Sequence, residues 1–200
     1  LVALDEASGL HEDQISLLSG VRSGGVAEVT KIQSERTHAR TRMIWLSNPR
    51  SGRRLDSYNY GCLAVRELIG RVEDIARFDI AVTAASGEVP SGVAFAMQNK
   101  KVPHIYTSKL CSELILWVWS RTPDNIKIGT DTEKAVYEAV NVLDTKYSSA
   151  IPLVEPSEQR VKLIRLSVSL ACRLFSTSNG EDVVVTPKHV AEVLSFLQKC

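Results

Sequence analysis

The hydrophobic pattern of this chain changes character near Pro103, and this change limits the fold classes open to it. Before Pro103, short apolar runs typical of buried strands alternate with amphipathic segments and polar turns. After Thr107, the apolar residues follow a helical period throughout. The pattern predicts an α/β part over residues 1–105, followed by an all-helical part over residues 106–200.

The first part is expected to combine apolar strands, helices and an exposed hairpin. Strands are predicted at residues 1–4, 43–46 and 78–83, helices at 11–18 and 63–74, and the hairpin at about 26–41. Ser19-Gly20 and Ser23-Gly24-Gly25 are expected to break the chain after the first helix. In the second part, four helices without intervening strands are predicted to form a bundle. They lie at about residues 110–120, 130–147, 157–175 and 187–199, the last one capped by Thr186-Pro187.

Charge and cysteine usage exclude several classes of protein. Lys plus Arg number 24 and Asp plus Glu 23, so nucleic-acid binding would require a local basic patch. The four cysteines are far apart without CxxC spacing, which argues against zinc and favours a reduced, cytoplasmic setting. No apolar run reaches the roughly 18 residues of a membrane span, and no signal peptide is visible. Because Leu1 opens directly on a strand, the chain is expected to be a fragment.

Asp5 and Glu6 are the first candidates for chemistry, because they directly follow the first predicted strand. Ligands bind at the carboxyl ends of strands in open α/β sheets. There, one carboxylate can hold Mg²⁺ through a water, and the next can activate an attacking water. A solvated turn after an ordinary strand is the alternative interpretation.

Asn48 and Arg77 are the next candidates. Asn48 ends the second apolar strand, so it would lie beside Asp5-Glu6 if the two strands are neighbours; Asn-Pro is otherwise a common turn. Arg77 precedes the third predicted strand and suits either a surface ion pair or an arginine finger. Such a finger reaches a neighbouring subunit's γ-phosphate and stabilises transition-state charge.

Five segments in order resemble the minichromosome maintenance (MCM) family of replicative helicases. Leu4-Asp5-Glu6 resembles its Walker B motif, and Ala39-Arg40-Thr41 before the strand ending in Asn48-Pro49 resembles its sensor 1 strand. Ala76-Arg77-Phe78-Asp79 resembles its S-R-F-D finger, with Ala for Ser. Leu163-Ile164-Arg165-Leu166-Ser167 and Thr186-Pro187-Lys188-His189-Val190 resemble the L-I-R-L-S and T-P-E-D-V segments of its helical lid.

The resemblance implies a divergent, bacterial- or phage-like AAA+ ATPase that uses ATP and Mg²⁺. Residues 1–105 would be part of the αβα core, from Walker B to the arginine finger, and residues 106–200 the helical lid. Asp5 would correspond to the carboxylate that binds Mg²⁺ through water, Glu6 to the catalytic base, Asn48 to sensor 1 and Arg77 to the finger. The partners implied are DNA and neighbouring subunits of a homo-oligomeric ring.

The hairpin at about residues 26–41 would match the family's pre-sensor 1 hairpin, which contacts DNA phosphates. Lys31 falls within one residue of the family's channel lysine; alternatively, it is a solvated lysine. Arg50, Arg53 and Arg54 either face DNA or a neighbouring subunit, or belong to a solvated loop.

The chain also departs from the family. It contains no Gly-rich Walker A cradle with its Gly-Lys-Ser or Gly-Lys-Thr, so the chain alone is expected to be inactive. Glu158 occupies the sensor 2 position, and the nearest arginine is Arg160. Two other classes therefore stay open: another AAA+ remodelling ATPase, similar to magnesium chelatases or enhancer-binding ATPases, and a non-catalytic AAA+ remnant that acts as an interaction module.

Overall fold

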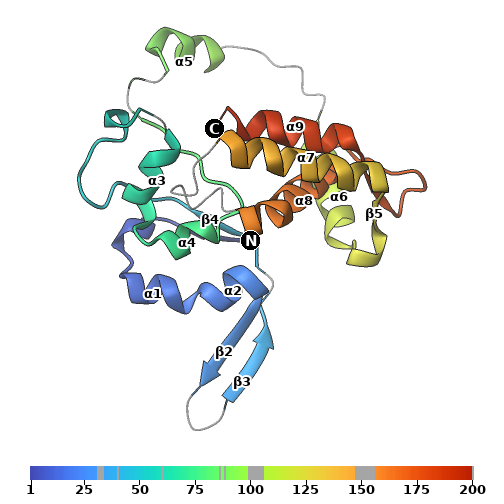
Figure 1. Ribbon diagram of the computed structural model, residues 1–200, viewed down its shortest axis with the longest axis horizontal. Coiled ribbons are helices and arrows are strands. Elements are labelled where there is room, and N and C mark those ends of the chain that lie inside the picture. The colour runs from blue at the N-terminus through green and yellow to red at the C-terminus, as the bar shows by residue number, and fades with distance from the viewer. Residues whose placement is uncertain are drawn as a thin grey trace. The chain divides into compact units, whose positions relative to one another are not determined.

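The computed structural model describes residues 1–30, 34–39, 41–59, 61–85, 87, 89–98, 106–146 and 156–199. Within them the chain is mixed α/β, with short strands and a majority of helix (Figure 1). Two compact units separate by their contacts: unit 1 covers Leu1–Glu88, and unit 2 covers Val89–Ser148 and Pro156–Lys199. The predicted boundary at residues 105–106 borders residues outside the described ranges and stays a prediction.

Unit 1 is built on a short parallel sheet. Strand β1 (Val2–Leu4) pairs with β4 (Met43–Trp45), with Val2 opposite Met43, so the two strands are neighbours, which is the condition for Asn48 to lie beside Asp5-Glu6. Between them, β2 (Val26–Thr30) and β3 (Ser34–His38) form the predicted antiparallel hairpin. The helices of this unit are α1 (Glu12–Leu17), α2 (Ser19–Gly24), α3 (Gly61–Ile69) and α4 (Val72–Ala76), with 3-10 turns η1 (Ala7–Gly9) and η2 (Leu55–Ser57).

The core of unit 1 lies between β4 and the two helices that follow it. Val65, Ile69 and Ile75 are buried there. Trp45 and Phe78 pack against these three residues and meet one another edge to face, with ring centroids 5.4 Å apart. Burial of these large side chains positions the ends of β1 and β4, where the candidate site lies.

Three predictions for unit 1 are wrong. The predicted break at Ser19-Gly20 is helix α2, which ends only at Gly25, whose φ of 62° suits glycine. The predicted helix over 63–74 is interrupted at Gly70, where φ is 88°. The predicted strand at 78–83 is irregular chain that pairs with no strand among the described residues, although Phe78 and Ala81 pack on the core.

Unit 2 contains the predicted helices and a sheet that was not expected. Helices α6 (Ser108–Trp119), α7 (Thr130–Lys146), α8 (Pro156–Arg173) and α9 (Pro187–Leu197) match the predicted positions, and α5 (Ser91–Gln98) is additional. Pro187 is the first residue of α9 after its N-cap Thr186, as predicted. The prediction of a bundle without strands is wrong, because β5 (Ile126–Ile128) pairs in parallel with β6 (Val183–Val185). Val183 and Val185 are buried with Ala171 and Cys172, so these strands belong to the core.

Candidate functional site

The ends of β1 and β4 open on a cavity of about 520 Å³ within unit 1. Asp5 and Glu6, which follow β1, and Asn48, which follows β4, line this cavity. They meet because parallel paired strands bring their carboxyl ends to the same edge of the sheet. The fold therefore brings two carboxylates and one amide from separate segments into one site.

The backbone at Glu6 has an uncommon conformation. Glu6 lies in the left-handed region, with φ 53° and ψ 40°, and its N–H donates to Oδ1 of Asp5 at 2.9 Å. The ladder resumes at once, because the Ala7 N–H donates to the Leu46 carbonyl at 2.8 Å. A left-handed non-glycine residue costs about 1–2 kcal/mol, and such residues cluster at functional sites. The strained turn holds both carboxylates at the exposed rim of the cavity.

Arg50 fixes the two sides of this site to one another. Its guanidinium donates to three backbone carbonyls: Nη2 to Ala7 at 2.8 Å, Nη1 to Leu10 at 3.0 Å and Nε to Leu68 at 3.0 Å. The Arg50 guanidinium is therefore engaged within unit 1 rather than free in a solvated loop, and its contact with DNA or a neighbouring subunit stays a prediction. A planar five-donor group suits this role, since it satisfies carbonyls from η1 and α3 together.

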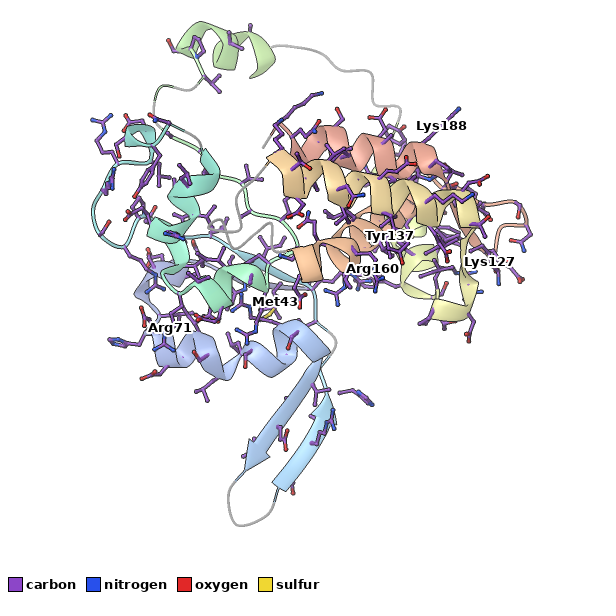
Figure 2. The ribbon with its side chains drawn as sticks, viewed as in Figure 1. Met43, Arg71, Lys127, Tyr137, Arg160 and Lys188 are labelled. Atoms are coloured by element: carbon purple, nitrogen blue, oxygen red, sulfur yellow. The ribbon has the colours of Figure 1, made fainter. Side chains whose placement is uncertain are left out.

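The remaining wall of the cavity is largely apolar. Met43, labelled in Figure 2, contributes to it from β4, and Val82 and Thr83 contribute from the irregular chain after Phe78. In the described part of the chain, no lysine or arginine lines the cavity. A phosphate group at Asp5-Glu6 would therefore need cationic and backbone donors from other residues.

The donors present fit a magnesium ion held with a nucleotide. Mg²⁺ in such sites keeps several waters and takes one or two carboxylates together with substrate phosphates. Asp5 supplies an exposed carboxylate of this kind. Among the described residues, no cluster of three acidic, histidine or cysteine side chains could hold a metal without a substrate.

Arg77 does not line the cavity in this structure. Its Nη1 lies 3.5 Å from Oδ1 of Asp74 and donates to the Glu73 carbonyl at 3.1 Å. The side chain is 35% exposed. Arg77 is thus folded back on its own helix α4.

Arg22 and Asp74 form a buried ion pair that the sequence analysis did not identify. Nη1 of Arg22 lies 3.0 Å from Oδ1 of Asp74, and Nη2 donates to the Asp74 carbonyl. The guanidinium carbon stands 4.9 Å from the Trp45 ring centroid and 4.5 Å from that of Phe78. Burial lowers the pKa of Arg22, whereas the Asp74 charge raises it and the neighbouring Arg77 charge lowers it. No motif marks this pair; the available signal was an arginine within a run of small residues.

Of the other predicted residues, Arg160 belongs to unit 2 and Lys31 lies outside the described ranges. Arg160, on α8 in unit 2, donates from Nη1 to the hydroxyl of Tyr137 at 3.1 Å, and Figure 2 shows the two side chains together. Lys31 lies outside the described residues, although the flanking strands of its hairpin are described. Across the two strands, Glu28 stands opposite Arg36, so this part of the hairpin carries both signs of charge.

Comparison with protein-family models and with curated proteins gives no match for this chain. In the described ranges, no helix combines the length and the apolar character needed to cross a bilayer. Inference of function therefore depends on the cavity and its residues.

Proposed function

We propose that this chain is the second half of an MCM-like AAA+ ATPase module, in which a ring of subunits couples ATP hydrolysis to movement along DNA. One observation carries the proposal: Asp5, Glu6 and Asn48 line the same cavity at the carboxyl ends of paired parallel strands. An isolated solvated turn after a strand would not need an amide from the neighbouring strand at its side. The site residues keep the order and spacing of the family's motifs.

The three residues would divide the work of hydrolysis. Asp5 would hold Mg²⁺ through a water, and the ion would neutralise charge on the phosphates. Glu6 accepts a proton from the water that attacks the γ-phosphorus, while the bond to the leaving ADP oxygen breaks. Asn48 holds the attacking water and a γ-phosphate oxygen by its amide.

Two components of the reaction must come from outside these 200 residues. No lysine or arginine is among the described residues that line the cavity, which supports a phosphate cradle on another segment of the intact protein. The position of Arg77 away from the cavity supports its use in trans, at a neighbouring subunit's nucleotide. Arg160 would approach nucleotide only after leaving Tyr137.

The exposed hairpin would supply the DNA contact. Its strands carry both signs of charge, so contact with DNA phosphates would depend on Lys31, which lies between the two strands in the sequence, rather than on a general basic patch. Affinity of this kind falls with salt and does not read sequence.

The decisive experiment replaces the proposed base in the intact protein. Glu6→Gln keeps the size of the side chain but cannot accept the proton, so kcat for ATP should fall about 10²–10⁴-fold with nucleotide binding retained. Asp13→Asn removes an exposed carboxylate of α1 and serves as the control, with kcat expected to stay unchanged. Wild-type turnover by Glu6→Gln would overturn the proposal.

A second experiment separates the helicase from the remodelling ATPase, which the balanced charges of the hairpin would also suit. Lys31→Ala should abolish single-stranded DNA binding and DNA-stimulated hydrolysis, whereas the control Lys109→Ala, on α6, should not. Hydrolysis without any response to DNA would favour the remodelling ATPase. An intact protein without turnover would favour the non-catalytic remnant, a reading that the apolar cavity wall also suits.

A further inference from the structure

One carboxylate oxygen in unit 1 serves two arginines with different surroundings. Oδ1 of Asp74 lies 3.0 Å from Nη1 of Arg22 and 3.5 Å from Nη1 of Arg77. Asp74 and Arg22 are almost fully buried, with side-chain exposures of 3% and 4%, whereas Arg77 reaches solvent. The two guanidinium groups repel one another and share one carboxylate oxygen. A closer contact between Asp74 and Arg22 therefore weakens the attraction between Asp74 and Arg77.

Arg22 is also mechanically connected to the hairpin. It lies in the last turn of α2, and Gly25 joins that helix directly to β2. The Gly25 N–H donates to the Val21 carbonyl at 3.1 Å, and the Gly25 carbonyl accepts from Ala39, which follows β3, at 2.7 Å. Figure 1 shows the hairpin extending from the end of α2.

Helix α2 and the first residue of β2 are in close contact. A Cβ added at Gly20 would stand 2.9 Å from the Val26 carbonyl oxygen, closer than real Cβ contacts allow. A displacement of the hairpin must therefore carry α2 and Arg22 with it, because packed elements transmit strain.

We infer that Asp74 is a positioning residue that holds Arg77 back on α4, and that the hairpin, through Arg22, controls this hold. When DNA displaces the hairpin, α2 moves Arg22 closer to Asp74. The Asp74 carboxylate then pairs with Arg22 alone, and Arg77 is released toward the neighbouring subunit. Without DNA, Asp74 is shared and Arg77 stays folded back. The inference rests on the proposed function, since it assigns a control to the same finger.

The test compares ATP hydrolysis by the intact protein with and without single-stranded DNA. Asp74→Asn removes the carboxylate that holds Arg77 on α4. The hydrolysis rate without DNA should therefore rise about fivefold, which is the lower end of usual coupling effects, and DNA should not raise it further. Arg22→Met leaves Asp74 to Arg77 alone, so the rate without DNA should fall and DNA should again add nothing. A merely structural role would lower the rate in both variants, so the opposite signs distinguish the two roles.

Further variants guard against a failure to fold. The double variant Arg22→Met with Asp74→Asn leaves no buried charge without its partner and should reproduce Asp74→Asn. Asp74→Glu keeps the charge and should restore the response to DNA. Glu73→Gln removes an exposed carboxylate from the same helix and should behave as the wild type.

The outcomes separate this inference from the proposed function. Normal hydrolysis by Arg77→Ala would show that Arg77 is no finger and would overturn the proposed role itself. Loss of hydrolysis in Arg77→Ala, together with a normal DNA response in Asp74→Asn or the double variant, would overturn only the inference. A rate that falls in the double variant would overturn it as well.

Discussion

Arg22 has a charged side chain at a position where sequence patterns place a loop. It is tolerated because each part of the guanidinium has a partner: Asp74 receives its N–H groups, and the faces of Trp45 and Phe78 lie beside it. Weakly hydrated, planar guanidinium is better suited to such a site than an ammonium group. The stability of unit 1 should therefore depend on this pair more than on any exposed ion pair.

Replacement of Arg22 by Met should reduce the free energy of unfolding by about 3–5 kcal/mol, because Asp74 is left buried with a poorly placed partner. Urea denaturation followed by tryptophan fluorescence and circular dichroism measures this loss. Arg71→Met is the matched control, since the Arg71–Glu12 pair is exposed and its removal should change stability little. Equal losses in the two variants would contradict the importance of burial.

His189 should make unit 2 sensitive to acid. Its Nδ1 accepts the Thr186 backbone N–H at 3.0 Å at the start of α9, and burial lowers its pKa. A lowered folded pKa means that the unfolded chain binds the proton more readily. The contribution to stability is thus complete above about pH 6.5, the unfolded value, and is lost as the pH falls below it.

The urea concentration at the unfolding midpoint of unit 2 should accordingly decrease as the pH is lowered from 7.5 to 5.5. His189→Gln keeps an acceptor at this capping position but does not titrate, so its midpoint should change less over the same range. An equal decline in both proteins would assign the acid sensitivity to other groups.

At the scale of elements, sequence periodicity predicted the helices and strands that depend only on neighbouring residues. Helices α6, α7, α8 and α9 have amphipathic patterns within their own sequence, and the β2–β3 hairpin pairs neighbouring segments. Strands β5 and β6 were not predicted because three residues are too few to show a period, and the partner of each strand lies far along the chain. Helix α2 escaped because its glycines suggest a break, while packing against the hairpin overrides that preference.

The candidate site likewise contains some residues that the sequence pattern predicts and others that only long-range contacts reveal. Asp5, Glu6 and Asn48 were identifiable because each follows an apolar strand, and a parallel sheet brings strand ends together. The Arg50 contacts and the Arg22–Asp74 pair join segments that have no sequence relation to each other. Only the folded chain reveals such contacts.

Two glycines of α2 provide a matched test of how this helix meets the hairpin. Gly20→Ala should destabilise unit 1, because the added Cβ would lie 2.9 Å from the Val26 carbonyl oxygen. Gly24→Ala places a Cβ in open space and should raise stability by about 0.5–1 kcal/mol, since alanine loses less backbone entropy in a helix. Urea denaturation of both variants decides the matter, and a stabilising Gly20→Ala would show that the contact is loose.

At the scale of the whole molecule, the proposed active site lies within unit 1, and its phosphate-binding part belongs to other residues. The purified 200-residue chain should therefore show no ATP turnover above that of its Glu6→Gln variant. Phosphate release measured with Mg²⁺ and ATP tests this, with the intact protein as the positive control. Turnover by the 200-residue chain that Glu6→Gln abolishes would show that the chain supplies its own phosphate cradle.

The parallel pairing of β1 with β4 has a consequence for biosynthesis. The ribosome releases Val2–Leu4 before Met43–Trp45, so β1 must wait for β4 to emerge, whereas β2 and β3 can pair almost as soon as they leave the exit tunnel. During that interval the edge of β1 that later pairs with β4 is unpaired, and such an edge attracts other nascent chains or chaperones. The carboxylates that follow β1 thus reach their final places only after strands β2 and β3 have paired.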